Sequence, residues 1–510
     1  MKLTRILNRW AIAMVVCVGM SLQTAMANDM RVTNVVLSTG DFSTYTIVQA
    51  DISWDHSWRA SWADSGTWTN WDAAWIFVKY RLSGSNWMHA SLDTANDRHG
   101  SSPGGTINVG LSTNISGANF GTGAFLYRSD EGSGLFTNTV RLRWNYAQDG
   151  LTKNDKVDIS VHAIEMVYVP QGSFYLGDGA TANLMGQFEE GQFTNAFLVT
   201  GEGQLTLGGG TPGSLGNNNT NGMFTGAPGD DFNDIATTNL PATFPKGYNA
   251  FYCMKYEITQ GQYADFLNML TPVQAGNRYI NTNGFSRYTI ASNAIYEAGA
   301  PDRACNFLSW ADGAAYADWA GLRPMTELEF EKACRGPATP IPNEFAWGNI
   351  SYTDTTGFSG DADGSGLETA LPAGANCNLN YNDILGPVRS GIYATAASGR
   401  TASGATYWGI MDMSGNLQER AVTVGNAKGR TFAGTHGDGF LASNGCATNN
   451  LDWPASWTGG GVTNAQGGGV RGGSWNNNAL DIRASARFLG SYMAAFRSSS
   501  YGFRVARSAP

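Results

Sequence analysis

The first part of the chain alternates between apolar and polar positions with a period of two. The apolar positions are Val48, Ala50, Ile52 and Trp54, then Ile76, Val78 and Tyr80, then Val140, Leu142, Trp144 and Tyr146. Such alternation is typical of strands that bury one face. Turn-rich stretches such as residues 96–105 separate the runs, and no run has the period of a helix. The pattern predicts an all-β sandwich over residues 28–163.

Helical periodicity is confined to the later part of the chain. Apolar residues recur with i, i+3, i+4, i+7 spacing at Tyr263, Phe266, Leu267 and Leu270. Thr259 stands where an N-cap would start that helix. Ser309 begins a second expected helix that continues to Gly321, and the T-x-x-E box of Thr326 and Glu329 begins a third. These helices predict a change of fold class along the chain, from all-β to α+β.

The second domain is predicted to extend over residues 164–510 and to contain a long insertion. Its first residues, 166–170, have the pattern of a strand that ends in proline. Residues 178–247 are instead rich in Gly, Asn and Thr and contain few apolar runs, which is typical of a surface excursion. The expected architecture is therefore multidomain, with a β-sandwich followed by an α+β domain that has much irregular structure.

The N-terminus has the three parts of a secretory signal peptide. Residues 1–27 comprise a basic start, an apolar run at 11–20 and an A-x-A cleavage site at 25–27. No later stretch reaches the roughly 18 apolar residues that a transmembrane helix needs. We therefore expect an exported chain that begins near Asn28 and has no transmembrane segment, located in the periplasm, at the cell surface or in the medium.

Composition narrows the classes of partner. The 510 residues include 65 glycines and 16 tryptophans, and only 14% are charged, which favours loop-rich extracytoplasmic folds over helical bundles. The formal net charge is −9 and no basic run stands out. Because binding to phosphates needs clustered Lys and Arg, we expect no nucleic-acid partner.

The cysteines leave several arrangements open. Beyond the signal peptide the chain carries Cys253, Cys305, Cys334, Cys377 and Cys446. An oxidising compartment would allow two disulfides and one free thiol, but spacing alone does not determine the pairing. There is no C-x-x-C motif, so a zinc ribbon or a thioredoxin-type site is not expected.

Four ordered motifs relate the second domain to a known family. They are Tyr-Glu-Ile-Thr at 256–259, Trp-Ala-Gly-Leu-Arg-Pro-Met-Thr-Glu at 319–327, Asp-Met-Ser-Gly-Asn-Leu-Gln-Glu at 412–419, and a terminal frame of Arg-Gly-Gly-Ser-Trp at 471–475 with Gly-Phe-Arg at 502–504. In this order they resemble the formylglycine-generating, or sulfatase-modifying factor, superfamily. The resemblance implies that family's α+β fold, which is related to C-type lectins.

The chemistry of the catalytic members is not fully matched. Those members place a pair of copper-binding cysteines inside the terminal frame, whereas no cysteine follows Cys446 here. Copper is therefore not expected, because Cu(I) needs soft thiolate ligands. Other relatives bind iron through imidazoles, and His436 is the one histidine within 164–510. A facial triad with two histidines cannot be built from it alone.

Calcium is the metal that the resemblance favours. In catalytic relatives the stretch that matches 412–419 supplies a structural calcium site, because hard oxygen ligands suit that ion. The resemblance places the ligands at Asp412, Gly415, Leu417 and Glu419, with a second site near Asn378 and Leu379. The alternative is a tight turn at Gly415 with Glu419 in a salt bridge.

The terminal segment 471–504 combines a fixed frame with an aperiodic filling. Arg471, Arg483, Arg487 and Arg504 are predicted to hold loops through bidentate contacts. Between them, apolar and small polar residues follow neither a 3.6 nor a 2.0 period. This filling resembles the variable region of diversity-generating retroelement proteins, whose products bind diverse ligands. Aromatic, Ser and Asn side chains also suit recognition.

The resemblance gives a predicted ligand-binding surface, with core packing as the alternative role for its apolar members. Its residues are Asn476, Asn477, Asn478, Leu480, Asp481, Ile482, Phe488, Leu489, Ser491, Tyr492, Met493, Phe496, Ser498, Ser499, Ser500 and Tyr501. The leading hypothesis is an exported, non-catalytic protein that binds a macromolecular or glycan ligand. The alternatives are an oxidoreductase of the same superfamily with a divergent site, and a structural scaffold at the cell surface.

Overall fold

The computed structural model describes residues 30–510 with several gaps. The gaps are 39–42, 65, 115, 180–183, 185, 192–194, 218–236, 362, 382–383 and 449–450. The predicted signal peptide, residues 1–27, lies outside the described residues, as does part of the predicted insertion. Among the described residues, none of the helices has the length and apolar character needed to cross a bilayer.

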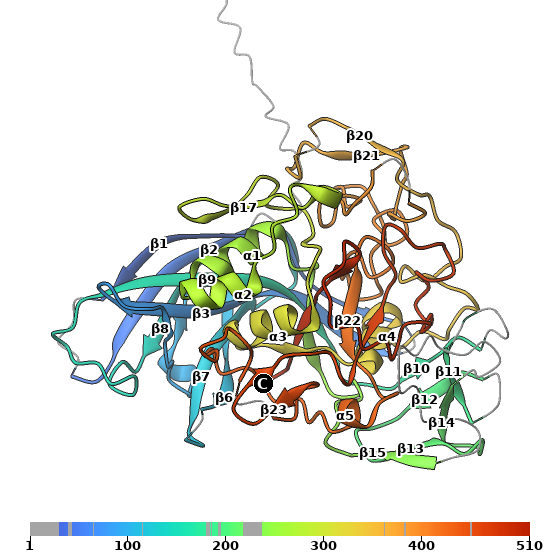
Figure 1. Ribbon diagram of the computed structural model, residues 1–510, viewed down its shortest axis with the longest axis horizontal. Coiled ribbons are helices and arrows are strands. Elements are labelled where there is room, and N and C mark those ends of the chain that lie inside the picture. Colours follow the sequence, from blue (N-terminus) through green and yellow to red (C-terminus); the bar gives the residue numbers. More distant parts are fainter. Residues whose placement is uncertain are drawn as a thin grey trace, which may run out of the picture.

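The protein is rich in strands and has few helices (Figure 1). The first strands are β1 (Arg31–Leu37), β2 (Thr46–Ala63), β3 (Thr67–Leu82), β4 (Met88–His89), β5 (Gly100–Ser101), β6 (Gly105–Thr113), β7 (Asn119–Arg128), β8 (Gly132–Trp144) and β9 (Val157–Val169). The later strands are β16 (Phe251–Met254), β17 (Ile290–Ser292), β18 (Tyr296–Ala298), β19 (Arg323–Pro324), β20 (Gly357–Ser359), β21 (Thr369–Leu371), β22 (Gln418–Val422), β23 (Ser456–Trp457), β24 (Gly461–Val462), β25 (Gly468–Arg471), β26 (Tyr501–Gly502) and β27 (Val505–Ser508). The helices are α1 (Gln260–Asn268), α2 (Pro272–Arg278), α3 (Trp310–Trp319), α4 (Glu327–Arg335) and α5 (Ala427–Arg430), with 3-10 turns at Asn96–Arg98 and Phe285–Arg287.

The predicted faces of the early strands are confirmed. Val48, Ala50, Ile52 and Trp54 are at most 1% exposed, and the apolar positions of β3 and β8 pack against them in one cluster. β3 pairs with β2 up to Trp71 and with β7 from Ala74, while β9 occupies its other edge. The sheet therefore forks, and the cluster fills the space between its branches.

The two predicted domains share one sheet. Its strand order is β19-β27-β16-β9-β3-β2-β8-β5. β9 pairs with β3 from Val157 to Val167, and Met166 to Val169 pair with β16 on the other edge. The predicted boundary between residues 163 and 164 thus lies inside β9. The sequence did not reveal this, because the residues of a strand do not show which neighbouring strands it will pair with.

The described part of the predicted insertion is more ordered than an open loop. β10 (Phe174–Leu176) precedes the insertion. The strands of the insertion are β11 (Phe188–Glu190), β12 (Phe197–Val199), β13 (Leu205–Gly208), β14 (Leu215–Asn217) and β15 (Thr237–Leu240). β11, β14, β13 and β15 form a small sheet, and Phe188, Leu207 and Leu215 are buried. The apolar residues are separated along the chain by Gly and Asn, so the sequence shows no run although they meet across strands.

The three predicted helix starts are confirmed. Thr259, Ser309 and Thr326 are the N-caps of α1, α3 and α4, and each side chain accepts a hydrogen bond from a backbone N–H in the first turn. In return, the backbone N–H of each cap residue donates to the N3 side chain, which is Asp312 in α3. Loss of such a cap typically costs about 1 kcal/mol.

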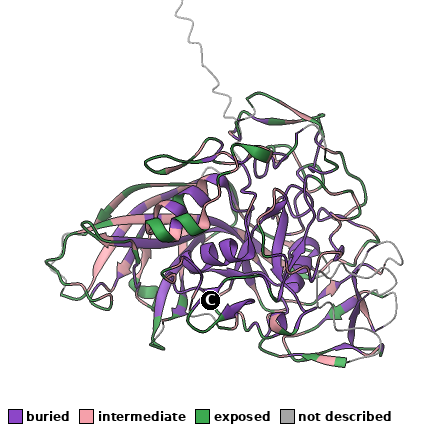
Figure 2. Ribbon diagram, in the orientation of Figure 1, coloured by how far each residue is buried: buried purple, intermediate pink, exposed green. Residues whose placement is uncertain are grey.

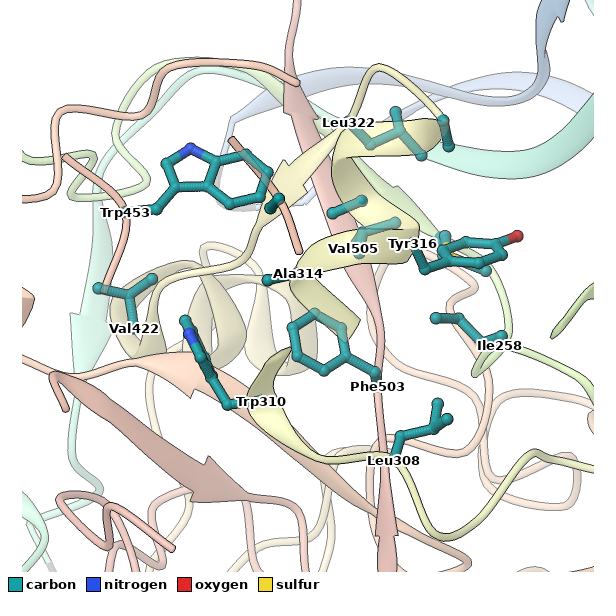
Figure 3. Close-up of a cluster of buried hydrophobic side chains, with 14 of the residues drawn as sticks. Ile258, Leu308, Trp310, Ala314, Tyr316, Leu322, Val422, Trp453, Phe503 and Val505 are labelled. Carbon is teal, nitrogen blue, oxygen red and sulfur yellow. The ribbon is translucent and has the colours of Figure 1, made fainter. Parts of the chain in front are cut away.

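Helix α3 lies at the centre of the largest hydrophobic cluster (Figure 3). Trp310 and Tyr316 from the helix are buried beside Phe503 and Val505 from the C-terminal segment. A Cβ at Gly313 would lie 1.8 Å from the Phe503 ring, so glycine at this position lets the helix approach that ring. Burial of one such aromatic side chain contributes roughly 1.5–3 kcal/mol.

The cysteines after residue 27 are free thiols. Cys253, Cys305, Cys334, Cys377 and Cys446 are all buried, and none forms a disulfide. Figure 2 shows that buried residues extend through both the sheet and the irregular C-terminal part. The fold is therefore held by packing and by the buried ion pairs described next, with no covalent cross-link among the described residues.

Candidate functional site

A three-stranded sheet brings the family motifs together. β22 lies between β25 and β26, and Glu419 in β22 is in register with Arg471 on one side and Gly502 on the other. The segment 412–419 therefore lies against both ends of the terminal frame. Motifs that are distant in sequence form one buried core at this point.

Two arginines of the frame converge on one carboxylate. Arg487 donates from Nε and Nη2 to the two oxygens of Glu327, at 2.7 and 3.0 Å. Arg471 approaches Glu327 at 3.4 Å and Glu331 at 2.6 Å. Burial alone would raise the pKa of Glu327, but Arg487 and then Arg471 hold it below its usual value. The predicted bidentate contact is confirmed for Arg487.

The third frame arginine binds the carboxylate at the end of the 412–419 motif. Arg504 donates to Oε1 of Glu419 from Nε at 3.0 Å and from Nη2 at 2.9 Å. Its other hydrogen bonds go to the backbone carbonyls of Met254 and Met411. Arg483 instead contacts the Asn343 side chain. These arginines stabilise loops through hydrogen bonds, as the sequence predicts.

The predicted calcium ligands lie in a buried acidic region. Asp412 accepts a hydrogen bond from the Gly391 N–H at 2.7 Å, and Glu257 accepts from the Leu417 N–H at 2.9 Å. Burial raises the pKa of Glu419 to about 7 in spite of Arg504. Burial, followed by the charges of Glu419 and Asp412, raises the pKa of Glu257 well above its usual value.

The second predicted calcium site lies beside the first. Nδ2 of Asn378 donates to the Gly386 carbonyl at 3.1 Å. The backbone carbonyl of Asn378 accepts from the Asn416 N–H at 3.0 Å. The Leu379 N–H donates to Asp354 at 3.0 Å. The structure therefore brings Asn378 and Leu379 next to the turn that contains Gly415.

One feature of this region favours a cation. Oε2 of Glu419 is buried and has no hydrogen-bond partner among the described residues, which leaves an oxygen for a ligand. Within the same residues, no three His, Cys, Asp or Glu side chains form a group that could hold a metal ion, so a calcium site here would also use backbone carbonyl oxygens. Calcium at 412–419 stays a prediction, and no chemical step is assigned to it.

The predicted ligand-binding residues differ in exposure. The exposed ones are Asn476, Asn478, Leu480 and Phe496, those of intermediate burial are Asn477, Asp481, Phe488, Leu489, Tyr492, Met493, Ser498 and Ser499, and the buried ones are Ile482, Ser491, Ser500 and Tyr501. Ile482 packs with Cys377 and Leu379, and Tyr501 packs with Val470 and Ala494. The side chains of Ile482 and Tyr501 therefore serve the core and not the surface, a distinction that the aperiodic sequence does not reveal.

A small cleft runs along the terminal frame. Its lining residues are Gln418, Val470, Arg471, Gly472, Gly473, Asn477, Asp481, Ala486, Phe488 and Leu489, and its volume is about 20 Å³. A space of this size holds about one water-sized molecule. Gly472 and Gly473 have φ of 81° and 65°, which favours glycine, and their turn lets the backbone approach the cleft.

The cleft wall carries a short chain of polar side chains. Gln418 donates to Oδ1 of Asn477 at 3.2 Å, and Asn477 donates to Asp481 at 3.2 Å. Burial raises the pKa of Asp481, partly offset by its bond from Asn477. Nε of Arg471 is buried with no acceptor among the described residues. An acid with a raised pKa and a fixed cation thus lie on one cleft.

Known redox metals of the superfamily do not fit the residues that the structure describes. Burial raises the pKa of the Cys253 thiol to about 12 and raises that of the Cys334 thiol well above its usual value, so neither forms a thiolate readily. His436 is half-buried. Burial lowers its pKa, and its Nε2 accepts the Ser508 N–H at 3.1 Å. Neither a thiolate pair nor a two-histidine set lies at the cleft.

Sequence reasoning missed the acidic partners of the frame. Glu327 and Glu331 are one helical turn apart in α4 and face Arg471 together. Two glutamates at i and i+4, the first of them inside the T-x-x-E box, were visible in the sequence. Their burial was not, because glutamate side chains are usually exposed and are rarely buried without a partner that the sequence does not identify.

Comparisons with known proteins agree with the motifs. Residues 154–509 match the model of the sulfatase-modifying factor enzyme 1-like domain. A hercynine oxygenase of Mycolicibacterium thermoresistibile is 38% identical over 90 residues, which are 17% of this chain and 20% of that protein. A hercynine oxygenase of Mycobacterium tuberculosis is 39% identical over 89 residues, which are 17% of this chain and 21% of that protein. The match thus spans about a fifth of the length of these relatives.

Proposed function

The chain belongs to the sulfatase-modifying factor enzyme 1-like family, and we propose that it is an oxidoreductase of this family whose reacting centre is the cleft beside Arg471 and Asp481. The prediction of a non-catalytic binding protein is corrected, because the similar proteins are named as oxygenases. The superfamily alternative with a divergent site takes its place.

The observation that carries the proposal is the rigid placement of ionisable groups on a cleft made by the family's own frame. Arg471 is anchored by Glu331 at 2.6 Å, so its guanidinium cannot swing away from the cleft. Fixed charges aimed at a reacting centre stabilise developing charge without reorganisation. A core-only role would not need a polar chain from Gln418 to Asp481 on that wall.

The residues of the cleft have distinct roles under this proposal. Asp481, whose pKa is raised by burial, accepts or returns a proton closer to neutral pH than an exposed carboxyl would. Asn477 orients Asp481 through its 3.2 Å bond. Arg471 stabilises negative charge through its buried Nε. The cleft has room for about one small molecule, which suits a small oxidant such as dioxygen.

The redox group is the part of the proposal that departs from the superfamily. The residues at the cleft match neither the copper thiolate pair nor the two-histidine iron set. The proposal assigns the reaction class and the proton-handling residues of this chain.

The test is oxygen uptake by the purified, exported chain. Hercynine and a thiol-containing peptide serve as probes, each with no added metal, with iron or with copper, while metal content is measured by mass spectrometry. We expect uptake with at least one probe and a loss of about tenfold or more in kcat for Asp481→Asn. Asp130→Asn, at an exposed turn, is the matched control and should leave kcat unchanged.

Two outcomes would contradict the proposal. The first is a folded protein that consumes no oxygen with either probe under any metal condition. The second is uptake that Asp481→Asn leaves at the level of the Asp130→Asn control. The second outcome would place the reacting centre away from this cleft.

A further inference from the structure

A large cavity lies where the early strands meet the helices of the family domain. Its volume is about 710 Å³, which is enough for a small organic molecule. β3 and β4 contribute one wall, and the segment from the end of α1 into α2 contributes another. The wall residues that matter here are Lys79, Trp87, Met88, Leu270, Trp319 and Phe440. The cavity is separate from the cleft beside Arg471, with which it shares no lining residue.

Among the described residues that line the cavity, Lys79 has the one cationic side chain. It is 2% exposed, and its Nζ donates to the carbonyls of Trp319 and Gly439 at 2.7 and 3.0 Å. A neutral amine has two N–H bonds and a lone pair. Both carbonyls can thus be satisfied while the lone pair of Lys79 remains available for chemistry.

The surroundings favour that neutral form. Burial lowers the pKa of Lys79 to about 7, although the charges of Asp318 and Asp438 oppose the shift. A large fraction of the amine is therefore unprotonated near neutral pH, and a desolvated lysine in this state is a nucleophile. The lining of the cavity combines aromatic and apolar side chains such as Trp87 and Phe440 with polar ones such as Asn86 and Gln274.

A second polar group, the indole N–H of Trp319, belongs to a residue beside Lys79. Nε1 of Trp319 is buried and has no hydrogen-bond acceptor among the described residues. Trp319 also supplies the carbonyl that holds Lys79. Nζ of Lys79 also lies 5.2 Å from the centre of the Trp319 ring.

We propose that this cavity binds a small aromatic or apolar aldehyde or ketone and that Nζ of Lys79 forms an imine with its carbonyl carbon. The lone pair of Nζ forms the new C–N bond, and the carbonyl oxygen takes the displaced electron pair and a proton from water. The resulting hydroxyl leaves with a second proton as water while the C=N bond forms and Nζ loses its hydrogens. An amine and a carbonyl compound become an imine and one water, with no oxidant or reductant.

Lys332 serves as an internal control for the reactivity of a buried lysine outside the cavity. It is also 2% exposed, and its Nζ donates to the carbonyls of Gly247 and Tyr248 at 2.5 and 3.0 Å. Burial lowers its pKa to about 7 as well. Lys332 does not line the cavity. The two lysines therefore separate the effect of the cavity from that of a lowered pKa.

The experiment traps the imine in the full chain. The folded protein is incubated with benzaldehyde and sodium cyanoborohydride, which reduces an imine to a stable benzyl amine. Peptide mapping by mass spectrometry then gives the rate of modification at each lysine. We expect Lys79 to react at least tenfold faster than Lys332 and faster than the exposed Lys153. Modification of Lys79 no faster than that of Lys332 would overturn the proposal.

A substitution at the mouth of the cavity provides a second readout. Val273 lines the cavity and is 66% exposed, so Val273→Trp narrows the entrance without disturbing the core. This variant should slow the labelling of Lys79 severalfold and leave that of Lys153 unchanged. Equal rates at Lys79 in both proteins would mean that the aldehyde does not use this cavity.

Discussion

Arg487 and Glu327 form a bidentate ion pair, with Nε and Nη2 of the arginine at 2.7 and 3.0 Å from the two carboxylate oxygens. Both side chains are buried. The same carboxylate accepts from the Val424 N–H at 2.8 Å. Glu327 therefore joins the start of α4, the segment that follows β22 and the terminal frame in one contact.

Glu327→Gln should destabilise the protein strongly. The change leaves the buried charge of Arg487 without its partner, which typically costs about 3–5 kcal/mol. Urea unfolding followed by tryptophan fluorescence measures the loss. Glu297→Gln, in the exposed position of β18, is the matched control and should change stability by less than about 0.5 kcal/mol. A loss at Glu327 as small as that of the control would refute the central role of this ion pair.

Stability should fall as the pH rises through the range in which Glu419 ionises. Its pKa is raised from 4.5 to about 7, so between these values the folded state binds more protons than the unfolded chain. Unfolding then becomes easier with increasing pH, by an amount on the order of 1–3 kcal/mol. Urea titrations at pH 5 and pH 7 test this.

Glu419→Gln should reduce that pH dependence, because glutamine does not titrate. Its absolute stability will also drop, since Arg504 loses its ionised partner at higher pH. The diagnostic quantity is thus the difference between the two pH values within each protein. An undiminished difference in Glu419→Gln would assign the effect to other buried carboxyls, such as Glu165.

Two glycine substitutions in helices should have opposite signs. Gly313→Ala places a methyl group 1.8 Å from the Phe503 ring and should cost about 1–3 kcal/mol through overpacking. Gly276→Ala in α2 has no atom within 4 Å of the new methyl and should stabilise by up to about 1 kcal/mol. Thermal unfolding of both variants gives the comparison. Similar shifts in the two would mean that α3 is not packed closely on Phe503.

Calcium binding at 412–419 is testable by ligand linkage. If the ion binds only the folded state, excess calcium raises the midpoint of thermal unfolding and a chelator lowers it. Asp412→Asn should weaken this response, whereas Asp130→Asn should keep it. An unfolding midpoint that is the same in calcium and in chelator would remove calcium from this turn.

The early strands should be needed for the family domain to fold. Trp75 donates to the Ala320 carbonyl at 2.8 Å, and β9 carries pairings to both β3 and β16. A fragment of residues 154–510 would expose that edge and the apolar surface beneath it. We expect it to aggregate or to bind a hydrophobic dye, in contrast to the full chain. A soluble, cooperatively unfolding fragment would show that the shared sheet is dispensable.

The sequence by itself determined the local structure and the family. The period of two in β2 fixes which side chains share a face, so the burial of Val48 to Trp54 could be predicted. The caps at Thr259, Ser309 and Thr326 could be predicted because they act on N–H groups within one turn. The order of motifs in 256–504 was enough to place the chain in its family.

Tertiary structure alone decided which distant segments meet. The pairing of Glu327 with Arg487, the sheet that crosses residues 163 and 164, and the cavity beside Lys79 join segments far apart in the chain. Periodicity reports the environment of a residue relative to its neighbours in sequence, whereas these contacts depend on the path of the whole backbone. For the same reason Ile482 could be read as a surface residue, although the fold packs it against Leu379 in the core.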